Sequence, residues 1–138
     1  MIIADTGFWL ALANSRDRHH QAAKRALTSL SEPLITTWLV VGETCHLLAT
    51  RLGVDAELAF LDGVARKAVE IFPLSVDHVP RALELVEKYR SLPMDLADAS
   101  LVILAEELGS GRILSTDQRD FRTYRWKSRK PFQNLLEL

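Results

Sequence analysis

Short apolar runs alternate with helical segments along the whole chain, and no other feature limits the possible folds as much. Residues 2–5 and 34–36 predict two buried strands, and each is followed by a segment whose apolar residues recur at helical spacing. Strands that alternate with helices form a mainly parallel sheet with helices on both faces. The sequence therefore predicts an α/β fold with four to five strands, the later ones at 69–74, at 112–115 and, in a less regular region, near Arg125 or Phe132.

Capping residues and glycine mark the ends of the predicted helices. Thr36 or Thr37 is expected to cap a helix over residues 38–51, which Gly53 ends, and Asp55 is expected to cap the helix that follows. The predicted helices span residues 8–13, 20–30, 38–51, 55–67, 77–89 and 96–108.

Length and hydropathy limit the kind of protein that the chain can be. With 138 residues the sequence predicts one domain over residues 1–138. No apolar stretch reaches the roughly 18 residues that a membrane span needs, so we expect no membrane partner. Met1 leads directly into a strand, without a basic leader and an apolar signal segment, which favours a cytoplasmic protein.

Four acidic residues lie where a carboxylate is locally out of place. Asp5 and Asp117 follow predicted strands, Glu43 lies one helical turn from apolar neighbours, and Asp98 lies near the start of an apolar helix. In parallel α/β folds, functional groups collect beyond the carboxyl ends of the strands. Carboxylates gathered there would repel one another unless a cation lay between them, and Mg²⁺ or Mn²⁺ suits oxygen ligands. The four acids therefore predict a metal site.

Each acid also has a simpler explanation when taken alone. Asp5 could cap the helix that begins near Phe8, and Asp95 competes with Asp98 for a similar capping role. Asp117 could begin a turn. Glu43 has no such role, because a glutamate among apolar residues within a helix is seldom buried without a partner.

A basic run covers the last third of the chain, although the formal net charge is only −1. Such a run indicates either a phosphate-binding face or a solvated surface, and taken alone it favours neither. The basic residues between positions 112 and 130 are Arg112, Arg119, Arg122, Arg125, Lys127, Arg129 and Lys130.

Sequence motifs for other catalytic mechanisms are missing. The chain contains neither the G-x-S-x-G turn of a serine hydrolase nor a phosphate-binding G-x-x-x-x-G-K-[ST] loop. A phosphatase of the haloacid-dehalogenase type would need a second acid two residues after Asp5, where Gly7 stands. A receiver domain would need a lysine on a late strand and a phosphoacceptor in the middle of the chain, and neither is evident.

Four segments resemble, in order and spacing, the four motifs of PIN-domain proteins. They are Ile3–Gly7, Val40–Thr44, Met94–Leu101 and Ser115–Phe121, and the resemblance spans essentially the whole chain. In size the chain is similar to the stand-alone VapC-type ribonuclease toxins of type II toxin–antitoxin systems.

This resemblance implies a three-layer α/β/α fold and a metal-dependent endoribonuclease with one or two Mg²⁺ or Mn²⁺ ions. It assigns Asp5, Glu43 and Asp98 as the central acids and Asp117 as the fourth, with Asp120 as the alternative. Further positions are expected to help: Thr6 and Thr116 by orienting the acids, Asp95 as a cap or outer acid, and Arg119, Arg122, Arg125 and Lys127 by binding RNA.

The resemblance also implies an inhibitory antitoxin partner and a homodimer. The apolar segment 58–61, with Val64, either contributes to a dimer interface or packs in the core of the protein itself. Two alternative functions remain from the sequence: a non-catalytic RNA- or partner-binding PIN module, and a housekeeping PIN nuclease.

Overall fold

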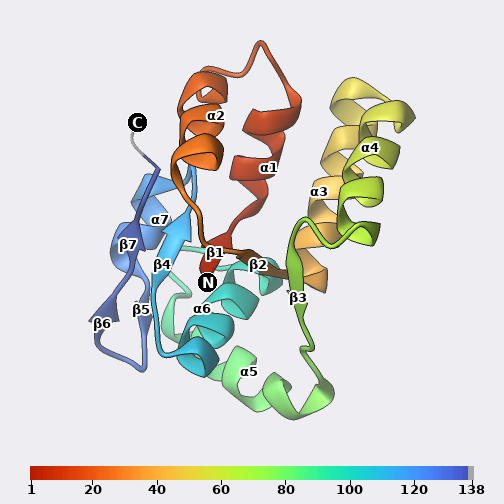
Figure 1. Cartoon of the computed structure of the whole chain (residues 1–138). Helices are drawn as coiled ribbons and strands as arrows, with labels where there is room; N and C mark the ends of the chain where they lie inside the picture. The colour runs from red at the N-terminus through yellow and green to blue at the C-terminus, as the bar shows by residue number, and fades with distance from the viewer. Residues whose placement is uncertain (137–138) are drawn as a thin grey trace.

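The computed structural model describes residues 1–136, and residues 137 and 138, the end of the predicted domain, lie outside the described residues. Its centre is a sheet of five strands in the order β3-β2-β1-β4-β7, and every pairing in it is parallel (Figure 1). The predicted α/β fold is confirmed. The strands are β1 (Ile2–Ala4), β2 (Leu34–Thr37), β3 (Glu70–Phe72), β4 (Arg112–Leu114) and β7 (Gln133–Asn134).

Helices cover both faces of this sheet, which gives the expected three layers. Figure 1 shows α1 and α2 on one side of the strands and α5 and α6 on the other. The helices are α1 (Thr6–Ala13), α2 (His20–Ser29), α3 (Trp38–Leu52), α4 (Val54–Ala65), α5 (Val79–Lys88), α6 (Leu96–Leu108) and α7 (Gln118–Thr123).

Two hydrophobic cores form because successive strand residues point to opposite faces of the sheet. Ile3, Ile35 and Ile113 pack with buried residues of α5 and α6. Their neighbours Ile2 and Leu114 pack with α1 and α2 on the other face. The central strands are therefore buried on both sides, and their positions are fixed.

The order of the strands creates a crevice between β1 and β4. The chain adds β2 and β3 on one side of β1 and then crosses over to add β4 on its other side. Ligands of open parallel sheets bind beyond the carboxyl ends of the strands at such a reversal. Asp5 directly follows β1, and Ser115 directly follows β4, so both lie at this point.

Three local expectations need correction. The predicted cap Asp55 lies in the first turn of α4, which follows Gly53 (φ 102°) and has no side-chain cap. The predicted helix 77–89 is divided into a 3₁₀ turn, η1 (Val76–His78), and α5, since Pro80 allows a fresh helix start. The last part of the chain is more regular than expected, with α7, the hairpin strands β5 (Arg125–Trp126) and β6 (Lys130–Pro131), and β7 in the sheet.

None of the helices formed by residues 1–136 combines the length and apolar character needed to cross a membrane.

Candidate active site

The six acidic residues singled out from the sequence line one cleft at the carboxyl ends of the strands. The cleft has a volume of about 320 Å³. The acids come from four separate segments of the chain, so the fold brings together what the sequence keeps apart. The lining residues are Asp5, Thr6, Gly7, Leu10, Glu43, Leu47, Pro93, Asp95, Asp98, Thr116, Asp117 and Asp120.

Asp5 is the most deeply placed of the central acids, with 7% of its surface exposed. It follows β1 and caps α1, because its Oδ1 accepts a hydrogen bond from the Thr6 N–H over 2.7 Å. Its Oδ2 accepts a hydrogen bond from the Ser115 hydroxyl over 2.9 Å. Burial raises the pKa of Asp5 to about 6, the charges of Glu43 and Asp117 add to this rise, and the two hydrogen bonds oppose it. The capping role and the place in the cleft are thus combined in one residue.

Glu43 reaches the same cleft from α3. Thr37 caps this helix by accepting a hydrogen bond from the Val40 N–H over 3.3 Å, which confirms one of the two predicted caps. Oε2 of Glu43 accepts a hydrogen bond from the Thr6 hydroxyl over 3.3 Å. Burial, followed by the charge of Asp95, raises the pKa of Glu43. This hydrogen bond is the kind of contact through which Thr6 is expected to orient an acid.

Asp95 and Asp98 divide two roles at the start of α6. Asp95 is the cap, since its Oδ1 accepts the Asp98 N–H over 2.7 Å. Asp98 lies in the first turn and is half-buried, and its Oδ2 accepts a hydrogen bond from the Tyr124 hydroxyl over 3.2 Å. Burial raises the pKa of Asp98 to about 8, with further contributions from the charges of Asp95 and Asp5.

Asp117 and Asp120 form the fourth acidic position as a pair. Asp117 caps α7 by accepting the Asp120 N–H over 3.1 Å, while Asp120 is buried with 6% of its surface exposed. Burial and a hydrogen bond with the Asp120 side chain raise the pKa of Asp117. Both residues line the cleft, so the predicted fourth acid has a close neighbour that shares its environment.

Gly7 lets the start of α1 approach the loop that follows β4. A Cβ atom at Gly7 would lie 1.9 Å from Oγ1 of Thr116. Thr116 thus lies in the cleft wall directly against α1. A larger residue at position 7 would displace this threonine.

Two residues of the site were missed by the sequence reasoning. Ser115 hydrogen bonds to Asp5 and also accepts the Asp117 N–H over 3.0 Å. Its position between a strand and Asp117 was a usable signal. Tyr124 gave no such signal, because it lies 26 residues from Asp98 in the sequence.

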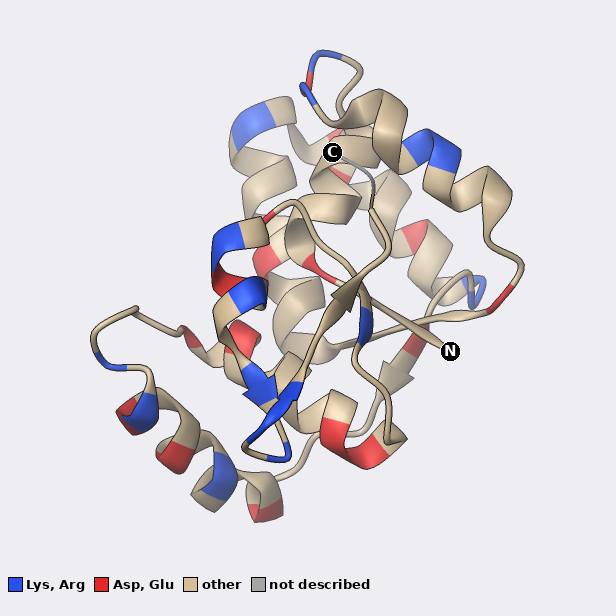
Figure 2. Cartoon of the chain, turned by 90° about the vertical axis from the view of Figure 1, so that its left-hand side faces the viewer, with Lys and Arg blue, Asp and Glu red and all other residues tan. Residues whose placement is uncertain are grey.

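The predicted RNA-binding residues differ in how free their charged groups are. Nη1 of Arg125 donates to the carbonyl groups of Arg122, Thr123 and Tyr124, over 2.7 to 3.2 Å. Arg119 donates to Asp120, whereas Lys127 is exposed at the turn of the β5–β6 hairpin. Figure 2 shows that basic residues occupy both strands and the turn of this hairpin.

The donor set of the cleft suits a hard divalent cation. The lining residues that could bind a metal ion do so through the oxygens of carboxylates and hydroxyl groups. Mg²⁺ and Mn²⁺ prefer such oxygen ligands. The raised pKa values of Asp5 and Asp98 indicate burial and repulsion that a cation would counteract. In residues 1–136 no group of three or more His, Cys, Asp or Glu side chains is already arranged to hold a metal ion.

Comparisons with known sequences match the chain over most of its length. The model of the PIN domain family matches residues 2–127. Ribonuclease VapC26 of Mycobacterium tuberculosis is 35% identical over 124 residues, which cover 90% of this chain and 92% of that protein. The 23S rRNA-specific endonuclease VapC20 of the same species is 30% identical over 109 residues, which cover 79% of this chain and 83% of that protein.

Solved structures share the fold. The crystal structure of Mycobacterium tuberculosis VapC20, described as a toxin that cleaves the sarcin–ricin loop, has a TM-score of 0.81 at 27% identity and covers 86% of this chain and 92% of that chain. The DNA-bound VapBC structure from Salmonella typhimurium has a TM-score of 0.65 at 14% identity and covers 97% of this chain and 98% of that chain. At that identity the second likeness concerns the fold alone.

Proposed function

Because this chain belongs to the PIN-domain family and is related to its VapC ribonucleases, we propose that it is a metal-dependent endoribonuclease that hydrolyses RNA phosphodiester bonds. The observation that carries the proposal is the cleft at the strand ends, where acids from four separate segments meet. The names of the related proteins, a ribonuclease and an rRNA-specific endonuclease, support the choice of RNA as the substrate.

Asp5, Glu43 and Asp98 would hold one or two Mg²⁺ or Mn²⁺ ions, with Asp117, or its neighbour Asp120, as the fourth acid. When bound, such an ion polarises a phosphate group and lowers the pKa of a water molecule, which makes that water a nucleophile near neutral pH.

The chain's own residues hold the acids in place. The Thr6 N–H and the Ser115 hydroxyl each donate a hydrogen bond to a different oxygen of Asp5, so both carboxylate oxygens are held in place. The Thr6 hydroxyl contacts Glu43, and Asp95 fixes the backbone at the start of α6. Hydrogen bonds of this kind orient carboxylates before a ligand arrives, which lowers the cost of assembling the site.

The basic surface of α7 and the β5–β6 hairpin would bind phosphate groups of the RNA that flank the cleft (Figure 2). The hairpin has four basic residues and no acid between positions 125 and 131. Lys127 and Arg129 are both exposed there. Binding through such residues weakens steeply as the salt concentration rises.

The decisive experiment compares RNA cleavage by the purified protein in Mg²⁺, in Mn²⁺ and in EDTA, with Asp98→Asn as the variant and Asp55→Asn, on α4, as the matched control. We expect cleavage that EDTA abolishes, that Asp98→Asn loses and that Asp55→Asn retains. Cleavage that survives both EDTA and the Asp98 substitution would contradict the proposal. Metal binding without cleavage of any RNA would instead favour a non-catalytic binding module.

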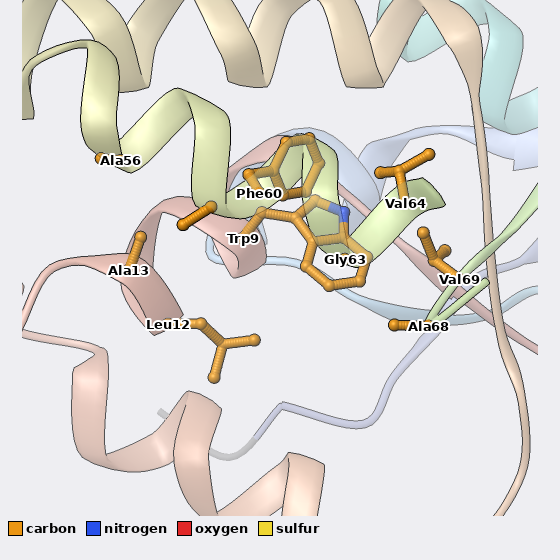
Figure 3. A pocket seen from close by; sticks show the side chains of 10 residues that line it. Trp9, Leu12, Ala13, Ala56, Phe60, Gly63, Val64, Ala68 and Val69 are labelled. Carbon is orange, nitrogen blue, oxygen red and sulfur yellow. The ribbon is translucent and has the colours of Figure 1, made fainter. Parts of the chain in front are cut away.

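An inhibitory protein partner is part of the proposal, since an unrestrained ribonuclease toxin would damage its host. An apolar groove of about 330 Å³ between α1 and α4 could accept apolar side chains of such a partner. Figure 3 shows Trp9 and Phe60 side by side in its centre, with ring centroids 5.6 Å apart. None of the residues of α4 is fully buried, and Leu58 is 56% exposed. Val64 packs against the core of the protein, whereas Leu58 and Leu61 are exposed, so that part of α4 is free to contact another chain.

The toxin assignment has a genetic and a biochemical test. We expect a short reading frame directly upstream whose co-expressed product suppresses RNA cleavage. An Ala59→Arg substitution in the groove should weaken this suppression and leave cleavage intact, because Ala59 lies outside the cleft. Suppression that Ala59→Arg leaves unchanged would argue against the groove, and a genome without such a partner would favour a housekeeping nuclease. A homodimer in solution also belongs to the proposal and is tested by light scattering.

A further inference from the structure

Tyr124 contacts Asp98 from the core of the protein. Its hydroxyl donates to Oδ2 of Asp98 over 3.2 Å, and its side chain is 0% exposed. Asp98 itself is half-buried and lines the cleft. The tyrosine therefore contacts the carboxylate from the protein interior.

Two aromatic rings and a backbone hydrogen bond fix the position of the Tyr124 ring. Its edge-to-face contacts join it to Tyr89, with centroids 5.0 Å apart, and to Phe121, with centroids 5.3 Å apart. Its backbone N–H donates to the Asp120 carbonyl over 2.8 Å at the end of α7. The hydroxyl that reaches Asp98 is therefore carried by a ring with little freedom to move.

Tyr89 provides a natural contrast to Tyr124. Both side chains are buried and both hydroxyl groups are bound, but the Tyr89 hydroxyl accepts the backbone N–H of Arg125 over 2.9 Å. Its role is to fix the chain after Tyr124. The Tyr124 hydroxyl instead binds the side chain of an acid that lines the cleft.

Asp98 needs such a donor because its surroundings are acidic. The charges of Asp95, Asp5 and Asp120 all act on it. Repulsion from three carboxylates favours rotation of the Asp98 side chain away from them, towards water. A hydrogen bond to one oxygen opposes this rotation and leaves the other oxygen for a ligand.

We propose that Tyr124 is a positioning residue that holds the Asp98 carboxylate in the conformation in which it binds a divalent cation. The inference rests on the proposed function, in which Asp98 is one of the metal-binding acids. Tyr124 would contact neither RNA nor metal and would act only through Asp98. The ring packing requires no hydroxyl, since phenylalanine has the same ring, so the hydroxyl is the group to remove.

The experiment compares Tyr124→Phe with Tyr89→Phe, which removes the same atom from the neighbouring buried ring. Mn²⁺ affinity is measured by calorimetry on the RNA-free protein, thermal unfolding reports on folding, and kcat and KM are measured on RNA. For Tyr124→Phe we expect Mn²⁺ affinity to fall about tenfold. We also expect kcat to fall at limiting Mn²⁺, KM for RNA to change little, and high Mn²⁺ to restore part of kcat. Tyr89→Phe should bind Mn²⁺ as the wild type does.

Two results would overturn the proposal. One is a folded Tyr124→Phe protein with wild-type Mn²⁺ affinity. The other is an equal loss of affinity in both variants, which would reduce the role of Tyr124 to packing. Wild-type protein that binds Mn²⁺ and cleaves no RNA would contradict the proposed function but not the role of Tyr124. The comparison of Mn²⁺ affinities would still decide that role.

Discussion

The hydroxyl of Ser115 donates a hydrogen bond to Oδ2 of Asp5 over 2.9 Å, although 110 residues separate the two in the sequence. The same hydroxyl oxygen accepts the Asp117 N–H over 3.0 Å. One serine at the end of β4 thus joins an acid at the end of β1 to the backbone of another acid. The neighbouring positions of β1 and β4 in the sheet make this possible.

Replacing Ser115 by alanine should impair both stability and cleavage. The buried Asp5 carboxylate would lose a donor, which costs about 1–3 kcal/mol in the free energy of unfolding. Because Asp5 would be less well oriented, we expect RNA cleavage to fall by about 10- to 100-fold. Chemical denaturation and a steady-state cleavage assay measure the two effects.

Ser110→Ala is the matched control for this substitution, since Ser110 lies at the other end of β4. Its hydroxyl accepts a long hydrogen bond, 3.5 Å, from the Arg112 N–H. We expect it to leave cleavage unchanged. Full activity of a stable Ser115→Ala protein would show that Asp5 needs no help from this serine.

Sequence patterns were sufficient to predict the α/β fold because the fold depends on which residues are buried. The apolar runs around Ile3, Ile35 and Ile113 are buried on both faces of the sheet, and such runs are visible without coordinates. The capping prediction failed at Asp55 because Gly53, with its positive φ, already sets the start of α4. Local boundaries of this kind depend on the preceding backbone, which composition does not reveal.

The acids of the cleft were predictable, whereas most of their hydrogen-bonding partners were not. Asp5 and Asp117 follow strands, and parallel strands bring their carboxyl ends together. Tyr124 reaches Asp98 through tertiary packing between α7 and α6, which no sequence spacing encodes. Similarly, the side chain of Arg125 is used to bind carbonyl groups at the end of α7, so its sequence position alone overstated its availability for RNA.

Divalent metal should stabilise the folded protein, and Glu43 should be needed for the full effect. A ligand that binds only the folded state adds about 2.7 kcal/mol at a hundred times its Kd. We therefore expect Mn²⁺ to raise the midpoint of thermal unfolding by several degrees, and to raise it less in Glu43→Gln. Glu57→Gln, on α4, serves as the control and should respond as the wild type does. An equal response of Glu43→Gln would exclude Glu43 as a ligand.

Lys127 and Arg125 should respond differently to alanine substitution. Lys127 is exposed, so Lys127→Ala should weaken RNA binding and reduce the slope of log K against log salt by about 0.7 for a single strand. Arg125→Ala removes a side chain that binds three carbonyl groups, so we expect a loss of stability and a smaller change in slope. Fluorescence anisotropy over a range of salt concentrations measures the slope. Lys24→Ala removes an exposed charge on α2, outside the proposed basic surface, and should leave the slope unchanged. A larger decrease of the slope in Arg125→Ala than in Lys127→Ala would contradict the prediction.

Glu106 connects α5, α6 and the β5–β6 hairpin, and its removal should produce a pH-dependent loss of stability. Nε and Nη2 of Arg81 donate to its two carboxylate oxygens over 2.9 and 2.7 Å, and the Lys127 N–H donates over 2.6 Å. A glutamine has one oxygen, so in Glu106→Gln its NH₂ group would face a donor, at a cost of about 1–3 kcal/mol.

The sign of the pH effect follows from the pKa of Glu106. Burial alone would raise this pKa from its ordinary value of 4.5, but the hydrogen bonds from Arg81 and from the Lys127 backbone outweigh burial and lower it. A carboxyl group with a lowered pKa in the folded state stabilises the protein above its unfolded-state pKa, and this contribution is lost as the pH falls through the folded-state pKa. The stability difference between wild type and Glu106→Gln should therefore be largest near neutral pH and shrink below about pH 4.5. Denaturation at a series of pH values measures it, with Glu107→Gln as the exposed control. A difference that stays constant down to strongly acidic pH would show that the charge of Glu106 contributes nothing.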